Sequence, residues 1–91
     1  MKHIPAEESA DLVAIALVLQ TVVGVQPRVD LSERYVQATV GEDTYCIQEM
    51  DTGGYLATAD NLLEFIEQEN ATADEALTCI EKWYDAAKAA D

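Results

Sequence analysis

The chain has 91 residues, of which 18 are Asp or Glu and 5 are Lys or Arg, so its formal net charge at pH 7 is −13. A surface this acidic repels DNA, RNA and anionic lipid, which excludes them as direct partners and favours a basic protein surface. Hydrophobic residues make up 49% of the chain, enough for a core, and the length predicts one compact domain over residues 1–91.

The apolar run from Leu12 to Leu19 is shorter than the ~20 residues that a membrane-spanning helix needs. Acidic residues precede it, where a secretion signal carries positive charge, so we expect a cytoplasmic protein. Cys46 and Cys79 lack the spacing and number of a zinc site or a disulfide framework. The sequence therefore predicts two reduced thiols, no metal and no cofactor.

The first predicted element is a helix over residues 5–25. Apolar residues recur there at helical spacing, and Val13, Leu17 and Val18 widen the apolar arc, which predicts a helix lying deep in the domain. Its β-branched residues leave a strand as the alternative for the second half, and its length favours a helix.

From residue 34 the pattern changes to short runs rich in Tyr, Thr, Val and Ile, which favour strands. These runs cover residues 34–40, 44–50 and 55–58, and Gly-containing segments at 41–43 and 51–54 separate them. Such segments are typical of tight turns. We therefore predict a three-stranded antiparallel meander.

Two more helices are predicted after the meander. Residues 61–69 place Phe65 and other apolar residues on one side of a helix. Thr72 and Glu75 form a capping box at the start of the last helix, which runs to about Ala89. The predicted fold is α+β with the order α-β-β-β-α-α, in which the helices cover one face of the sheet and leave the other exposed.

Aromatic residues suggest two further surfaces, each with a structural alternative. Trp83 and Tyr84 lie on the apolar side of the last helix, where core packing and a binding platform are both possible. Tyr35, Tyr45 and Tyr55 come close together on the sheet if the strands pair in simple register. The alternative is that they belong to a hydrophobic sheet face beneath the helices.

No pattern in the chain predicts catalysis. The only histidine, His3, lies near the N-terminus, and no pair of carboxylates is set apart by apolar neighbours as acid/base chemistry requires. No segment matches a calcium loop or a phosphate-binding loop. We therefore predict that the protein is not an enzyme.

The acidic residues are concentrated in one tract. Residues 35–81 contain 11 acidic and no basic residues, and on a helix Asp60, Glu64 and Glu67 form an outward row. Like charges at this spacing oppose helix stability. A protein that imitates a nucleic acid needs such clustering, because its carboxylates must take the place of the phosphates that a partner's Lys and Arg side chains bind. The candidate partner-binding residues are Glu42, Asp43, Glu49, Asp51, Asp60, Glu64, Glu67, Asp74 and Glu75.

In element order and charge, this small acidic chain resembles some phage-encoded anti-CRISPR proteins, in particular those that occupy the site where a CRISPR effector recognises the protospacer-adjacent motif. The resemblance implies a non-enzymatic, stoichiometric inhibitor that occupies a basic DNA-binding groove and excludes target DNA in the cytoplasm of the host cell. It assigns no residue, because these proteins share no common motif.

Two other classes of protein fit the same sequence. One is an intracellular adaptor or regulatory module, monomeric or homodimeric, that binds through its open sheet face or its last helix. The other is a protein of different function whose acidity maintains solubility in concentrated salt.

Overall fold

The structure is a computed structural model that describes residues 4–61 and 64–90, with side chains described for residues 12–61 and 64–89. It has two helices and five strands in this part of the chain. In chain order they are α1 (Ile4–Val23), β1 (Arg28–Asp30), β2 (Tyr35–Val40), β3 (Asp43–Glu49), β4 (Tyr55–Asp60), β5 (Phe65–Asn70) and α2 (Ala73–Ala90).

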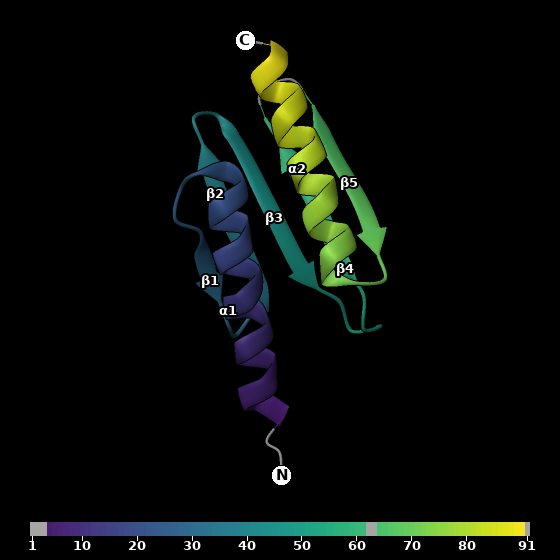
Figure 1. The fold of residues 1–91 in the computed structure, drawn as a ribbon. Coiled ribbons are helices and arrows are strands. Elements are labelled where there is room, and N and C mark those ends of the chain that lie inside the picture. Colours follow the sequence, from purple (N-terminus) through teal and green to yellow (C-terminus); the bar gives the residue numbers. More distant parts are fainter. Residues whose placement is uncertain (1–3, 62–63, 91) are drawn as a thin grey trace.

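The five strands form one antiparallel sheet in the order β1-β2-β3-β4-β5. Both helices lie on the same face of this sheet, α1 over β1 and β2 and α2 over β3, β4 and β5 (Figure 1). The predicted α+β class is confirmed. The prediction of three strands and three helices is wrong in detail, because the described chain adds β1 before the meander and replaces the middle helix with β5.

Helix α1 ends at Val23, close to the predicted boundary, because Gly24 adopts a φ of +79° and its N–H donates to the carbonyl of Gln20 at 2.8 Å. Glycine adopts this left-handed conformation without strain and commonly ends helices. The predicted depth of the helix is wrong. One long side of α1 is open to solvent, because the sheet and α2 pack against its other sides.

The position of the predicted meander is confirmed, and the structure also gives its strand register. β2 and β3 join through the two-residue turn Gly41-Glu42, with Val40 opposite Asp43. Gly41 has a φ of +63°, the conformation that tight hairpins require at this position. Each strand therefore places alternate residues toward the helices and alternate residues on an open face.

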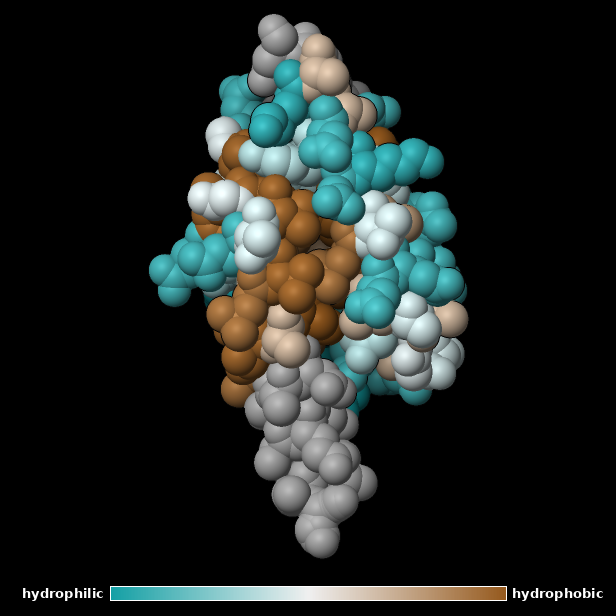
Figure 2. Space-filling view, viewed as in Figure 1, coloured by the Kyte–Doolittle hydropathy of each residue, from teal (hydrophilic) through white to brown (hydrophobic). Residues whose placement is uncertain are grey.

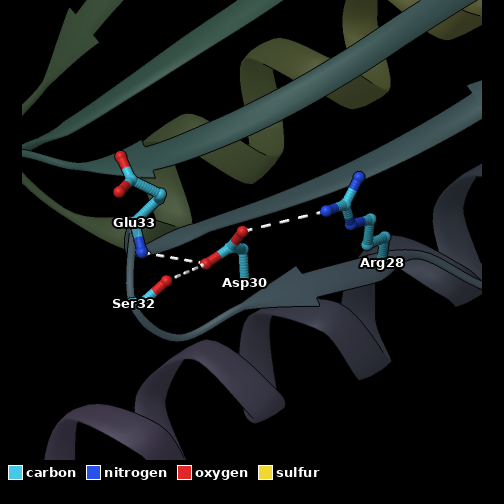
Figure 3. Close-up of polar contacts among 4 residues, drawn as sticks. All are labelled: Arg28, Asp30, Ser32 and Glu33. Carbon is cyan, nitrogen blue, oxygen red and sulfur yellow. Dashed lines mark hydrogen bonds and ion pairs between the residues drawn. The ribbon is translucent and has the colours of Figure 1, made fainter.

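Strand β1 is the element that the sequence analysis missed, and Asp30 shapes the turn that follows it (Figure 3). The Asp30 carboxylate accepts hydrogen bonds from the Glu33 amide at 2.9 Å and the Ser32 hydroxyl at 2.8 Å, and Arg28 lies 3.9 Å away. The Glu33 hydrogen bond, followed by that from Ser32, lowers the pKa of Asp30. The turn thus depends on the charged carboxylate.

The helix predicted over residues 61–69 does not form, and Phe65–Asn70 is instead the edge strand β5. Its register places Ile66 on the helix-covered face and Phe65 and Glu67 on the open face. Pairing with β4 aligns Asp60 with Phe65. Leu62 and Leu63, which the predicted helix included, lie outside the described residues.

The capping box at the start of α2 is confirmed. The Thr72 hydroxyl accepts from the Glu75 amide at 3.2 Å, and the Glu75 carboxylate accepts from the Ala71 amide at 3.0 Å. Both contacts satisfy backbone amides near the start of the helix that have no hydrogen-bond acceptor within the helix.

The core lies between the sheet and the two helices. Tyr45 is the largest of its fully buried side chains, and its ring meets that of Tyr84 edge to face, with centroids 6.0 Å apart. Tyr35 lies on the opposite, open face, so the three tyrosines do not form one cluster. The buried hydrophobic residues are Leu12, Ile15, Ala16, Leu19, Val23, Val36, Ala38, Tyr45, Ile47, Ala57, Ala76, Leu77 and Ile80.

Candidate functional site

Three of the predicted partner-binding acidic residues lie at one end of the sheet. Asp43 begins β3, Asp60 ends β4, and Glu64 precedes β5. The antiparallel pairing of β3 with β4 therefore brings Asp43 to the same sheet end as Asp60 and Glu64. The Asp43 side chain is on the helix-covered face, and that of Asp60 is on the open face, opposite Phe65. Asn61 fixes the connection, because its side-chain oxygen accepts from the Glu64 amide at 2.9 Å and its own amide donates to the Glu64 carbonyl at 3.1 Å.

A pocket of about 180 Å³ opens between these strand ends and the C-terminal half of α2. We call it the carboxylate pocket. Trp83 on α2 and Ile66 on β5 supply apolar lining. The complete lining is Asp43, Tyr45, Ala59, Asp60, Asn61, Glu64, Ile66, Trp83, Ala86 and Ala87.

The pocket combines an aromatic and aliphatic wall with negative charge. Burial, followed by the charge of Asp43 and the neighbouring Tyr84, raises the pKa of Tyr45, so Tyr45 is neutral at pH 7 and the carboxylates supply the charge. An apolar wall beside carboxylates complements a Lys or Arg side chain, whose methylene stem is apolar and whose head is cationic.

Two predicted residues extend the negative charge beyond the pocket. Glu42 is exposed in the β2–β3 turn next to Asp43. Glu67 is exposed on the open face of β5, opposite Thr58. Glu42 thus adds charge beside Asp43, and Glu67 adds charge on the open face of the sheet.

Three other predicted residues lie at the opposite ends of the same strands. Asp51 is exposed in the β3–β4 turn, and Asp74 and Glu75 are in the first turn of α2. Glu75 already accepts a backbone hydrogen bond as part of the capping box, and negative charge in a first helical turn stabilises the helix dipole. Asp74 and Glu75 therefore have a local structural role, and none of the three residues lines the carboxylate pocket.

Glu49 differs from the other predicted residues because a basic side chain lies beside it. Its carboxylate oxygen is 3.5 Å from Nε of Arg34, and the Glu49 side chain is only 15% exposed. The amide of Glu49 also donates to the Arg34 carbonyl at 2.9 Å. Although residues 35–81 contain no basic residue, Arg34 just before this tract partly neutralises Glu49, and we do not include Glu49 in the proposed binding surface.

Comparison of the chain with protein-family models, curated proteins and solved structures finds no match. Within the part of the chain that the structure describes, no group of three or more His, Cys, Asp or Glu side chains is placed to hold a metal ion. Over those same residues, no helix combines the length and the apolar content that crossing a bilayer requires.

Sequence reasoning alone does not place two residues of this region. For Trp83 it leaves core packing and a binding platform as alternatives, and the structure places Trp83 half-buried against the core and in the wall of the carboxylate pocket. The sequence predicts Phe65 on an apolar helix face, and the structure leaves it 58% exposed opposite Asp60. Phe65 and Ile66 are adjacent and are the only apolar residues of β5, so no periodicity in this segment reveals the direction of Phe65.

Proposed function

We propose that this protein is a non-enzymatic inhibitor that binds a basic nucleic-acid-binding protein in place of its nucleic acid. The carboxylate pocket carries the proposal, because Asp43, Asp60 and Glu64 line a hollow whose wall includes Trp83. A Lys or Arg side chain that contacts phosphate in the partner is the group that such a pocket accepts best.

The distribution of charge supports the same proposal. Residues 41–91, which contain β3, β4, β5 and α2, carry 13 acidic and 2 basic residues, a net charge of −11. Residues 1–40 carry five acidic and three basic residues, a net charge of −2. If each half supplies about half of the 5686 Å² surface, a patch of ~800 Å² on the acidic half carries about three net charges. Charge is thus concentrated on one side, as mimicry of a nucleic acid requires.

Within this class, we propose a CRISPR effector as the partner and its DNA-binding groove as the surface, following the resemblance to acidic phage anti-CRISPR proteins. Inhibition is then stoichiometric, because one copy of the protein occupies one groove. Association is fast and weakens as salt rises, because it depends on charge.

The direct test titrates the protein into purified CRISPR effector complexes and follows fluorescence anisotropy of a labelled target duplex. We expect loss of DNA binding that is complete at one copy of the protein per effector. Affinity capture from a host lysate, with mass spectrometry, covers basic nucleic-acid-binding proteins outside this class. Absence of both inhibition and such a captured partner at low salt overturns the proposal.

A matched pair of variants tests the site. Glu64→Lys with Glu67→Lys alters the carboxylate pocket and the adjoining β5 face, whereas Asp51→Lys with Glu81→Lys changes exposed residues elsewhere. Each double variant changes the net charge from −13 to −9. We expect the first to weaken inhibition at least tenfold and flatten its salt dependence, and the second to retain inhibition. Equal weakening by both means that net charge alone drives binding and refutes the site.

A further inference from the structure

The outward side of α1 exposes an apolar stripe to solvent. Val13, Leu17 and Val18 are 47%, 62% and 47% exposed, and Ala14 lies exposed between them. These residues repeat at helical spacing, so they lie along one side of α1 over about one and a half turns. Figure 2 shows a continuous hydrophobic area on the helix-covered face of the molecule. We call the four residues the α1 stripe.

A shallow groove extends the α1 stripe toward α2. It has a volume of about 250 Å³ and is mostly apolar, with Asp74 as its one charged lining residue. Its lining is Ala14, Ile15, Val18, Tyr55, Ala73, Asp74 and Leu77. Because the stripe stands beside this hollow, the surface has both a ridge and a groove. Helices pack on one another through this combination.

The α1 stripe lies in the part of the molecule that carries the least charge. No charged residue occurs between Asp11 and Arg28, and residues 1–40 have a net charge of −2, against −11 for residues 41–91. A basic partner is drawn to the acidic half and gains no charge contact at the stripe. A second copy of this acidic chain meets the least repulsion there, because its own α1 half is nearly neutral.

We propose that the α1 stripe is a homodimer interface, in which two copies pack α1 against α1 about a two-fold axis. Leu17 of each copy then seats in the groove between α1 and α2 of the other, since an isologous interface makes every contact twice. A stable interface buries ~800 Å² per partner, more than one helix side supplies, so the groove belongs to it as well, with Asp74 as the acidic residue of its lining. The two acidic halves point outward and apart.

Sedimentation equilibrium and light scattering of the purified chain test this interface. We expect a mass twice the 10.0 kDa of the chain. We also expect the dimer to tighten as salt is raised from about 0.05 to about 1 M, because the Debye length falls from more than ~10 Å to ~3 Å and the repulsion between the two acidic chains is screened. A site for a basic partner shows the opposite salt dependence. The measurement is made at about 200 μM protein, where a dimer with a Kd on the order of 100 μM is still populated. A mass of 10.0 kDa throughout this salt series overturns the proposal.

Leu17→Glu and Leu17→Lys both remove the apolar contact of Leu17, and only Leu17→Glu also adds negative charge to the interface. Both are expected to weaken dimerisation by at least about 100-fold, because the lost contact occurs twice and buried Leu contacts are strong. The matched control is Phe65→Glu, at a residue of similar exposure on the other half of the molecule, which is expected to leave the dimer intact. Circular dichroism confirms folding of each variant. Dissociation by Phe65→Glu, or an intact dimer in both Leu17 variants, refutes the interface.

Discussion

Replacing Tyr45 by alanine tests the central feature of the fold, its buried aromatic contact with Tyr84. Tyr45 is 2% exposed and packs edge to face on Tyr84. A buried aromatic side chain removes ~150–250 Å² from water, worth about 4–6 kcal/mol at ~25 cal/mol per Å². Measured substitutions of this kind cost about 3–5 kcal/mol. We therefore expect Tyr45→Ala to lower the free energy of unfolding by about 4 kcal/mol.

The control is the same substitution at Tyr35, which is half-buried on the open face opposite Gln48. Cross-strand contacts on such a face contribute ~0.2–1 kcal/mol, so Tyr35→Ala is expected to cost no more than about 1 kcal/mol. Urea denaturation followed by circular dichroism measures both. For a chain of this size, total stability is about 5–14 kcal/mol, so Tyr45→Leu serves as a milder variant if Tyr45→Ala does not fold.

The outcome that refutes this reasoning is equal destabilisation at the two tyrosines, or a loss below about 1.5 kcal/mol at Tyr45. Either result means that β3 does not present alternate residues to the helices in the observed register. A double-mutant cycle with Tyr84→Leu isolates the contact between the rings, for which the expected coupling is ~0.5–1.5 kcal/mol.

Three further measurements address other parts of the molecule. Burial raises the pKa of Tyr45 above its ordinary value of 10.0. The stability that the neutral phenol contributes is therefore present below pH 10 and is lost as pH rises through the folded-state pKa. In urea denaturation, Tyr45→Phe is expected to reduce this alkaline fall in the free energy of unfolding. The hydrogen bond from the Glu33 amide lowers the pKa of Asp30 below 3.8. The stability that the charged carboxylate contributes is therefore present above that pH and is lost as pH falls through the folded-state pKa. The difference in free energy of unfolding between wild type and Asp30→Asn should be larger at about pH 6 than at about pH 2, and a difference independent of pH contradicts this. Thr72→Ala removes the helix cap and is expected to lower the free energy of unfolding by about 1 kcal/mol, whereas Thr78→Ala, whose hydroxyl bonds a carbonyl within α2, should cost less than about 0.5 kcal/mol.

Elements with strong local signals were predictable from the sequence. Helix α1 has a long apolar period and a glycine stop, the β2–β3 hairpin has Gly41 at its turn, and α2 has the Thr72–Glu75 capping box. In each case the signal lies within a few residues of the element that it specifies. The α+β class and the position of the meander followed from these signals.

The two edge strands were not predictable from the same rules. β1 has only three residues, too few for a period, and its turn depends on side-chain contacts of Asp30. In β5 the spacing of Phe65 and Ile66 fits a helix as well as a strand, and pairing with β4 decides between them. Tertiary context therefore overrides local propensity at both edges of the sheet.

The site could be predicted in its chemistry and not in its geometry. The concentration of acidic residues identified Asp43, Asp60 and Glu64 as candidates, but their location at one end of the sheet depends on strand order. The position of Trp83 in the same pocket lining depends on how α2 crosses the sheet. The pairing of Glu49 with Arg34 likewise follows from strand register, since 14 residues separate the two in the chain. Charge counts alone cannot distinguish such a paired carboxylate from an exposed one.

The order of the sheet also determines how the chain is expected to fold. Each strand is hydrogen-bonded to the strand that follows it in the sequence, so every strand pairing closes a short loop, and topologies of this kind fold fast for their stability. Each helix packs mainly over strands near it in the chain, and the contact between α1 and α2 joins the most distant elements described. Docking of the two helices on each other is expected last. Substitutions at that contact should then speed unfolding while leaving the folding rate nearly unchanged.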